Sequence, residues 1–335
     1  IIPIMKFRYI KSILSAASLL LAVSVTSCIG DLDATPIDPN IVMTFDQASV
    51  FNKIYGTLGL TGQKGPDGSG DLDDIDEGTS SFYRMTWCAN QLMTDEAIVN
   101  SWNDAGVATI ADCSWSSSNE IVTGLYYRLT FDITLCNYFL EQTEGLTDDE
   151  TTRQRAEVRF IRALNNYYLM DMFGNPPYCD KVSTEKPQQI QRADLFAKIE
   201  EELKEIGDDA TATLAQPLQT TYGRVDRVAA WLLLARMYLN AEVYTGTPQW
   251  GKAKEYAQKV IDSGYKLAPV YKHLFMADND GSNVNKARQE VILPILQDGV
   301  RTKSWGGSLF LIAGPHKSDT GMNPWVSKQG WGGPH

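Results

Sequence analysis

Few side chains in this chain are of the types that carry catalysis or hold metal ions. Its 335 residues include three histidines, at positions 273, 316 and 335, and five cysteines that form no CxxC pair. A protein zinc site needs several His or Cys ligands at short, regular spacing. The chain also lacks Gly-x-Ser-x-Gly, His-Glu-x-x-His and phosphate-loop motifs. Metal-hydrolase and redox chemistry are therefore disfavoured.

Carboxylates offer one route to catalysis. A glycoside hydrolase uses two carboxylic acids that flank the scissile bond, and Asp95, Glu96 and Asp104 are candidates. Acidic residues are abundant, however, with 41 in the chain, and no motif selects a pair. A hydrolase with an acidic pair remains an alternative, and the favoured interpretation is that the protein is not an enzyme.

Tryptophan is the more informative residue type. Of the eight tryptophans, Trp87, Trp231 and Trp250 lie on apolar helical stripes and are predicted to be core. Four others lie in polar, Gly-rich surroundings where a core role is harder to argue: Trp102, Trp305, Trp325 and Trp331. A flat ring that stays exposed can stack on the apolar face of a ligand.

A short Asx-rich segment is a candidate calcium loop. Residues 278–283 read Asp-Asn-Asp-Gly-Ser-Asn, which places oxygen ligands at alternate positions and a Gly at the sharp turn. Asp278 and Asp280 are the candidate ligands for a structural Ca²⁺. Glu290 lies one residue too late to be the bidentate acid of an EF-hand, so a plain Asx-rich turn is the alternative. No cofactor is required.

The first residues have the pattern of a targeting signal. Met5 is the expected start, with residues 1–4 an upstream extension. Basic residues then precede the uncharged, largely apolar stretch from Ile13 to Val25. A transmembrane helix needs about 20 apolar residues, whereas this shorter run fits a secretory signal peptide over 1–27. A buried core helix is the alternative.

Cys28 closes this apolar run. Val25-Thr26-Ser27-Cys28 resembles the lipobox of bacterial lipoproteins, in which the cysteine is acylated and becomes the mature N-terminus. Asp31 and Asp33 follow, as in the surface-export signal of Bacteroidetes lipoproteins. Residues 28–44 are thus expected to be a lipidated N-terminus and tether. We expect a protein anchored by lipid to the outer membrane and facing the cell exterior.

The remainder is predicted to be mainly α. Apolar residues recur three or four apart in 45–60, 121–144, 151–173, 195–206, 224–244 and 250–263. Small residues at 229–230, 235, 253 and 257, with aromatics between them, resemble a tetratricopeptide unit. We expect a tetratricopeptide-like scaffold of helical pairs with long loops over about 119–264. A less regular, loop-rich part should follow over 265–335.

The net charge and the cysteine spacing indicate which class of partner to exclude and whether disulfides form. Lys and Arg total 30 against 41 Asp and Glu, and no basic tract occurs, so nucleic acid is not an expected partner. Cys88, Cys113, Cys136 and Cys179 are irregularly spaced. Because a chain of this size has no need of disulfides for stability, buried free thiols are the favoured interpretation, and disulfides are the alternative.

One segment resembles the signature helix of the SusD/RagB family. Residues 156–163 read Ala-Glu-Val-Arg-Phe-Ile-Arg-Ala, and they run on to Tyr167-Tyr168 and to Met172-Phe173-Gly174-Asn175-Pro176-Pro177. Thr94-Asp95-Glu96 after an aromatic-rich helix and the tetratricopeptide run at 229–257 match in the same order. Within the family, residues 62–66, 75–79 and 293–298 are most similar to the starch-binding founding members.

The resemblance implies a surface glycan-binding lipoprotein. It would bind starch or another oligosaccharide and pass it to a SusC-like TonB-dependent transporter. Family members are usually longer, so residues 45–335 are expected to form a SusD-like domain truncated at its C-terminus. A tetratricopeptide adaptor for peptides is an alternative.

The family's arc of aromatic rings, helped by an Arg and an Asn, implies a site here. By local context the ring candidates are Trp102 and Trp305, with Trp325 or Trp331 completing the arc. Arg84 and Asn103 are the candidate hydrogen-bond donors. Each has an alternative, since Arg84 could pair with a carboxylate and Asn103 could cap a turn.

Overall fold

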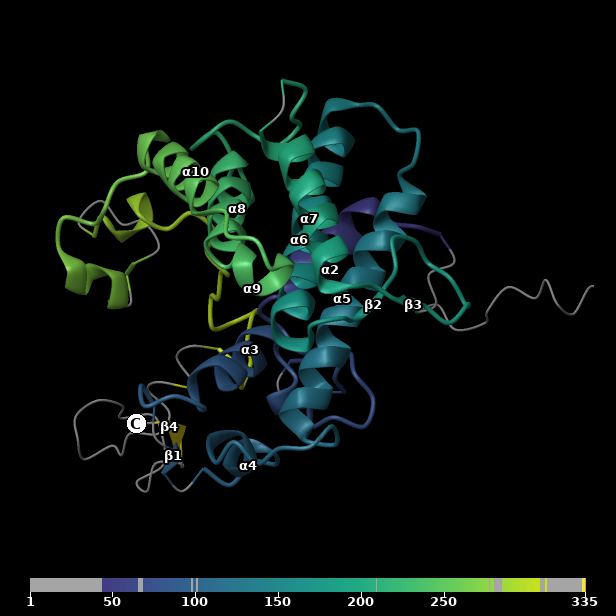
Figure 1. The fold of residues 1–335 in the computed structure, drawn as a ribbon, viewed down its shortest axis with the longest axis vertical. Helices are drawn as coiled ribbons and strands as arrows, with labels where there is room; N and C mark the ends of the chain where they lie inside the picture. The colour runs from purple at the N-terminus through teal and green to yellow at the C-terminus, as the bar shows by residue number, and fades with distance from the viewer. Residues whose placement is uncertain are drawn as a thin grey trace, which may run out of the picture. The chain divides into compact units, whose positions relative to one another are not determined.

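The computed structural model shows a chain that is mainly α-helical, with a few short strands. The described residues are 44–65, 69–97, 99–100, 102–208, 210–276, 278–279, 285–307, 311 and 333–334. The chain divides into two units, Ile1–Phe45 and Asp46–His335. Every helix and strand described below lies in the second unit (Figure 1). The predicted signal peptide and Cys28 lie outside the described residues.

The first long helices begin at capped residues. They are α2 (Gln47–Gly56), α5 (Glu120–Gln142) and α6 (Asp149–Phe173). The side chain of Asn119 accepts hydrogen bonds from the backbone N–H groups of Ile121 and Val122, and Asp148 accepts one from Thr151. These caps satisfy N–H groups that have no partner within the helix.

Successive helices pack as a layer of antiparallel pairs. They continue with α7 (Arg192–Gly207), α8 (Arg227–Leu239), α9 (Ala241–Thr245) and α10 (Trp250–Asp262). Helix α6 packs between α5 and α7, and α8 packs between α7 and α10 (Figure 1). The predicted tetratricopeptide-like scaffold is confirmed. One predicted helix, over 224–244, is divided at Asn240 into α8 and α9.

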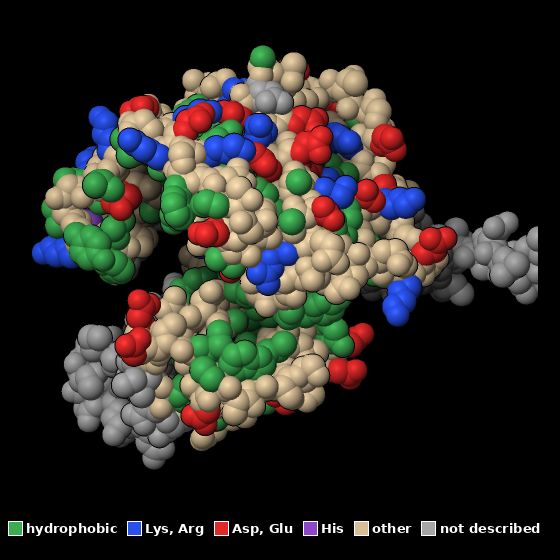
Figure 2. Space-filling view, viewed as in Figure 1, with side chains coloured by type: hydrophobic (Ala, Val, Ile, Leu, Met, Phe, Trp, Pro, Cys, Tyr) green, Lys and Arg blue, Asp and Glu red, His purple; other side chains and the backbone are tan. Residues whose placement is uncertain are grey.

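Arginines on α6 tie its neighbours to it. Arg159 pairs with Glu202 and Glu205 of α7 at 3.2 and 2.7 Å, and Arg162 pairs with the same Glu202 at 2.5 Å. Arg162 also donates to the side-chain oxygen of Asn137 on α5 at 2.9 Å. Basic and acidic side chains alternate over the visible face of these helices (Figure 2). These charges therefore serve the scaffold.

One predicted core tryptophan is not in the core. Trp250 is 60% exposed at the start of α10, where Ala253 and Tyr256 are the residues that face the neighbouring helix. Trp231 is half-buried, and its indole N–H donates to the backbone oxygen of Gly207 at 2.9 Å. Trp250 lies outside the buried face of α10 that Ala253 and Tyr256 form, so its apolar spacing does not imply burial.

Outside the helical pairs the elements are short. They are α3 (Phe82–Gln91), α4 (Val107–Ala111) and the 3-10 helices η2 (Glu77–Thr79), η3 (Tyr271–Phe275) and η4 (Ala287–Gln289). Strand β1 (Val99–Asn100) pairs antiparallel with β4 (Gly333–Pro334), and β2 (Pro177–Tyr178) pairs antiparallel with β3 (Gln188–Gln189). The registers are Val99 opposite Pro334 and Pro177 opposite Gln189.

An extended segment, residues 291–307, connects the helical pairs to α3. Three consecutive side chains in it lie against glycines. A Cβ on Gly59 would be 2.9 Å from Cγ2 of Ile295, and a Cβ on Gly223 would be 2.6 Å from Cδ1 of Leu296. Gln297 lies equally close to Gly307. The absence of a Cβ at these glycines leaves room for the three side chains, so this segment packs closely on its neighbours.

The described cysteines are free thiols. Cys88 and Cys136 are buried, as expected, while Cys113 is exposed. Burial raises the pKa of the Cys88 thiol to about 12, which keeps it protonated. Within the part of the chain that the structure describes, no helix has the length and apolar character needed to cross a bilayer.

Candidate functional site

Trp305 presents a partly open ring on a fixed loop. Its side chain is 42% exposed. One edge lies against η2, since a Cβ on Gly78 would be only 3.0 Å from Cδ1 of the indole. The next residue is held too, because the Ser81 hydroxyl donates to the backbone oxygen of Gly306 at 3.2 Å. The expectation of an exposed ring is confirmed for Trp305.

Arg84 lies beneath this loop and is 1% exposed. Its guanidinium donates to the backbone oxygen of Gly78 at 3.0 Å and to the carboxylate of Asp104. It also lies 5.1 Å from the ring centroid of Trp102. The prediction that Arg84 offers hydrogen bonds directly to a ligand is therefore wrong in this structure. The alternative, an ion pair with a carboxylate, is what the structure shows.

Trp102 is also a buried residue. It is 3% exposed and belongs to a core cluster with Cys88, Leu92, Val107, Ile110, Ile121 and Leu311. Its indole N–H donates to Oδ2 of Asp104 at 2.8 Å. The expectation of an open ring at Trp102 is wrong, because the apolar side chains of α4 and α5 cover it. Its polar sequence neighbours gave no sign of these distant partners.

Asn103 is exposed and lies between Trp102 and Asp104 in sequence. Hydrogen bonds then link Asp104 through Arg84 to Gly78, on which Trp305 packs. The structure thus gathers four predicted site residues into one place, with two at the surface and two beneath it. We call Trp305 and Asn103, with the partly exposed Asp104 and the buried Arg84 and Trp102 below them, the Trp305 surface. Trp325 and Trp331 lie outside the described residues.

Arg128 of α5 holds the segments on which the Trp305 surface rests. Its side chain is 0% exposed and donates to the backbone oxygens of Ser80 and Thr61 at 2.9 and 3.1 Å. It also pairs with Asp71 at 3.1 Å, and Asp71 pairs with Lys53 at 2.6 Å. A buried cation thus fixes two irregular segments to a long helix.

One turn along α5, a buried acid accompanies Arg128. Asp132 is 1% exposed. Burial raises the pKa of its carboxyl to about 7, while the positive charge of Arg128 opposes the rise. Asp132 is therefore a buried residue of α5 and not part of an exposed site.

The acids that a hydrolase would need are not arranged as a pair flanking a ligand. Asp95 and Glu96 are adjacent, exposed residues of one turn, and Asp104 is engaged by Arg84 and Trp102. Retaining and inverting glycosidases hold two carboxyl groups about 5 to 9.5 Å apart across the bond. The described residues show no motif of this kind around Trp305.

Only one of the two candidate calcium ligands lies among the described residues. Asp278 is exposed and accepts a hydrogen bond from the Asn285 amide at 3.0 Å, while Asp280 lies outside the described residues. Among the described residues, no group of three or more His, Cys, Asp or Glu side chains could hold a metal ion. A structural calcium ion stays a prediction.

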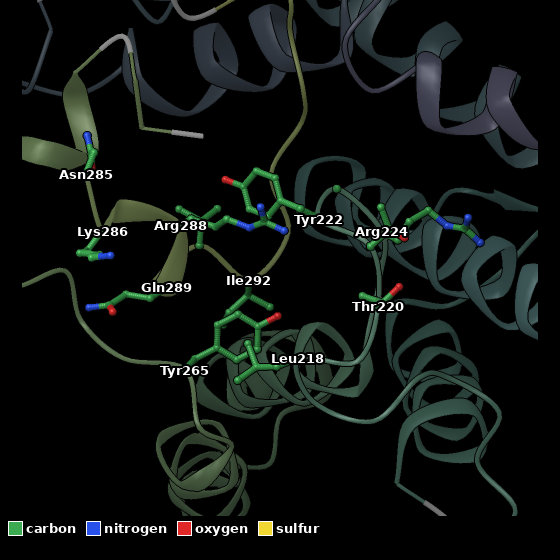
Figure 3. A pocket seen from close by; sticks show the side chains of 13 residues that line it. Leu218, Thr220, Tyr222, Arg224, Tyr265, Asn285, Lys286, Arg288, Gln289 and Ile292 are labelled. Atoms are coloured by element: carbon green, nitrogen blue, oxygen red, sulfur yellow. The ribbon is translucent and has the colours of Figure 1, made fainter. Parts of the chain in front are cut away.

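A cavity that the sequence did not predict lies at the start of the 291–307 segment, where Val291 and Ile292 line it. Its volume is about 340 Å³, and it is lined by parts of the segments 218–224, 285–292 and Tyr265 (Figure 3). Tyr222 carries the Arg288 guanidinium on its face at 4.3 Å from the ring centroid. Pairs of Tyr and Arg distant in sequence carry no spacing signal, so only the structure brings them together.

Comparison with known proteins places the chain in a family. Residues 72–239 match a family model, SusD-like, described as "Starch-binding associating with outer membrane". The chain is 49% identical over 328 residues to the starch-binding protein SusD of Bacteroides thetaiotaomicron. That match covers 98% of this chain and 58% of the relative, so the chain spans little more than half of the relative's length.

Solved structures show the same fold at low sequence identity. Surface glycan-binding protein A from Bacteroides uniformis has a TM-score of 0.56 at 18% identity, over 71% of this chain and 50% of that one. A SusD-like carbohydrate binding protein from Bacteroides fragilis has a TM-score of 0.55 at 19% identity, over 68% of this chain and 42% of that one. With its helical pairs, its signature helix α6 and a family match across half its length, the chain belongs to the SusD-like family.

Proposed function

We propose that the protein is a cell-surface glycan-binding protein that captures starch or malto-oligosaccharides and passes them to a SusC-like TonB-dependent transporter. The observation that carries the proposal is the Trp305 ring, 42% exposed and fixed against Gly78. The name of the 49% identical relative, a starch-binding protein, supports the choice of glycan. The neighbouring Asn103 adds an exposed amide that can donate to and accept from hydroxyl groups.

The chemistry of this surface is stacking. A sugar ring has apolar C–H faces, and an indole that covers about 100 Å² of such a face contributes roughly 2.5 kcal/mol before ordering losses. One ring with a few hydrogen bonds of about 1 kcal/mol each then gives dissociation constants of about the millimolar range. Weak, reversible binding suits a protein that hands its ligand to a transporter.

Binding without chemistry is favoured over both alternatives. The family description and the relative's name both refer to starch binding, and the candidate acids are exposed in one turn or engaged in an ion pair. A tetratricopeptide adaptor would bind its peptide on the helical pairs. Trp305 instead lies in a loop that packs on η2 and α3.

The family description supports an association with the outer membrane. We infer that acylation of Cys28 supplies the anchor and that the protein faces the cell exterior. Binding needs no cofactor, and a calcium ion at Asp278 and Asp280 would be structural.

The test is electrophoresis in a native gel that contains soluble starch. Starch should retard the wild-type protein, and Trp305→Ala should lose most of that retardation. Trp115→Ala is the matched control, because Trp115 is also 42% exposed but lies elsewhere, just before α5. Equal retardation of the wild type and Trp305→Ala would refute the assignment of the site. Release of reducing sugar from amylose, lost on substitution of Asp95 or Glu96, would refute the binding-only function.

A further inference from the structure

We propose that the cavity between the segments 218–224 and 285–292 is a second saccharide-binding site, separate from the Trp305 surface. The inference extends the proposed function, since it assigns a second place for the same class of ligand. The cavity volume of about 340 Å³ lies at the lower end of the range for ligand sites, about 300 to 1,000 Å³. It fits the end of an oligosaccharide, a sugar unit or two.

The walls of the cavity are held by a buried acid. Asp226 is 0% exposed, and its Oδ2 accepts hydrogen bonds from the Tyr265 hydroxyl and the Leu218 backbone N–H, both at 2.9 Å. Its Oδ1 accepts from the Val228 N–H at the start of α8. Burial, followed by the charge of Asp226, raises the pKa of Tyr265, so its hydroxyl remains a donor. One carboxylate thus fixes two walls to a helix.

The opposite wall is tied to the same frame. The Gln289 amide donates to the backbone oxygen of Leu267 at 2.8 Å, and the Lys266 N–H donates to the backbone oxygen of Gln289 at 3.0 Å. These bonds join η4 to the segment that carries Tyr265. The cavity is therefore preformed, and a ligand would not have to order its walls.

The lining combines rings with groups that bind hydroxyls. Figure 3 shows Arg288 lying across Tyr222 on one side, with Tyr265 and Leu218 on the other and Ile292 between them. Arg224 turns its guanidinium away from the cavity (Figure 3), toward its partner Glu157. Arg288 offers donors, and the hydroxyls of Thr220 and Tyr222 can donate and accept. Sugar hydroxyls also donate and accept, whereas an inorganic anion would use only donors.

Leu218 supplies an independent observation. Its φ is +62°, a left-handed conformation that is strained for a non-glycine residue, and it is 53% exposed. An exposed leucine gains little from burial that would offset this strain. The strain is understandable if the side chain serves a ligand, as an apolar ledge for the C–H face of a sugar.

The two sites have separate walls. No residue that lines the cavity belongs to the Trp305 surface, and the 291–307 segment runs from one to the other. Substitutions at one site therefore leave the other intact, which makes their contributions separable by experiment.

The experiment is saturation-transfer-difference NMR with maltotriose as the probe. In Trp305→Ala, a residual maltotriose signal should remain. It should fall at least fivefold when Arg288→Ala and Leu218→Gly are added. Leu218→Gly suits the left-handed backbone, so the thermal midpoint should not fall. Tyr271→Ala, at a 75% exposed residue of η3, is the matched control and should leave the signal unchanged.

The outcomes separate this inference from the proposed function. A residual signal that survives both cavity substitutions, or no signal at all in Trp305→Ala while the wild type binds, would overturn the second site and leave the proposed function standing. A signal abolished by the cavity substitutions alone would support the cavity and refute the role of Trp305. No signal in the wild type would overturn both.

Discussion

The Trp305 surface and the cavity between the segments 218–224 and 285–292 share one structural feature. In each, a carboxylate accepts a hydrogen bond from an aromatic side chain: Asp104 from the Trp102 indole at 2.8 Å, and Asp226 from the Tyr265 hydroxyl at 2.9 Å. The two carboxylates differ in the groups that compensate their negative charge. Asp104 pairs with the buried Arg84, whereas Asp226 accepts from backbone N–H groups and a hydroxyl.

This difference predicts how the stability of each site should respond to substitution of its charged residues. The Trp305 surface depends on buried cations, Arg84 and Arg128, which are costly to leave unpartnered. The cavity depends on neutral donors around one acid, each of which contributes less. The first site should therefore be more sensitive to loss of charge, and the cavity should be more tolerant.

The largest expected effect comes from Arg128→Met. It removes the buried cation that holds Asp71, Thr61 and Ser80 together, and it leaves the backbone oxygen of Ser80 without its donor. The free energy of unfolding should therefore fall by about 3 to 5 kcal/mol. Urea unfolding measures the loss. Starch retardation should weaken, while the maltotriose signal from the cavity persists. Arg153→Met is the control, because the Arg153 side chain is 55% exposed and, among the residues that the structure describes, pairs only with Glu150 of its own helix. Equal losses in the two variants would contradict the comparison.

A smaller effect should appear in the pH dependence of stability. The pKa of Asp132 is about 7 in the folded protein and about 3.9 in an unfolded chain. Between these values the folded state holds a proton that the unfolded state has lost. The free energy of unfolding should therefore fall as pH rises through this range, by up to roughly 1.4 kcal/mol per pH unit, and change little above it.

Asp132→Asn removes the titrating group and tests that slope. Urea unfolding at about pH 5 and pH 8 should show a smaller difference in the variant than in the wild type. Greater stability of the wild type at the higher pH, relative to the variant, would contradict the sign. The cavity should bind maltotriose equally well in both proteins, since Asp132 lies on α5 and does not line it.

The smallest effect is expected from Asp226→Asn. Asparagine is also a good helix N-cap, so α8 should remain, and the loss of charge-assisted hydrogen bonds should cost about 1.5 to 3 kcal/mol. Removal of the negative charge should lower the pKa of Tyr265. The ¹³C shift of the tyrosine Cζ atoms with pH measures this, with Tyr265→Phe to assign the resonance. An unchanged Tyr265 titration would show that Asp226 does not hold that wall.

The sequence predicted the scaffold more fully than the sites. Periodic apolar residues located α5, α6, α7 and α10 to within about three residues, because packing between neighbouring helices decides that pattern. Trp305 was correctly expected to be exposed, since two glycines follow it and offer no side chains to cover the ring. The sequence pattern was sufficient to predict structure wherever the packing of a residue is decided by residues near it in sequence.

The rest depended on distant contacts. Trp102 has polar neighbours in sequence, but its ring is covered by Val107, Ile110 and Ile121. Arg84 forms its ion pair with Asp104, which lies twenty residues away in sequence. The cavity unites residues from 218 to 292, and no spacing rule connects a strained leucine to a Tyr–Arg stack.

The three glycine contacts of Ile295, Leu296 and Gln297 have a mechanical consequence. Because consecutive side chains are seated on Gly59, Gly223 and Gly307, a methyl group at any of the three would force the end of the facing side chain to move. That backbone carries Ile292 at one end and Trp305 at the other. A single alanine at one of these glycines would thus disturb the packing of a segment that lines the cavity at one end and carries Trp305 at the other.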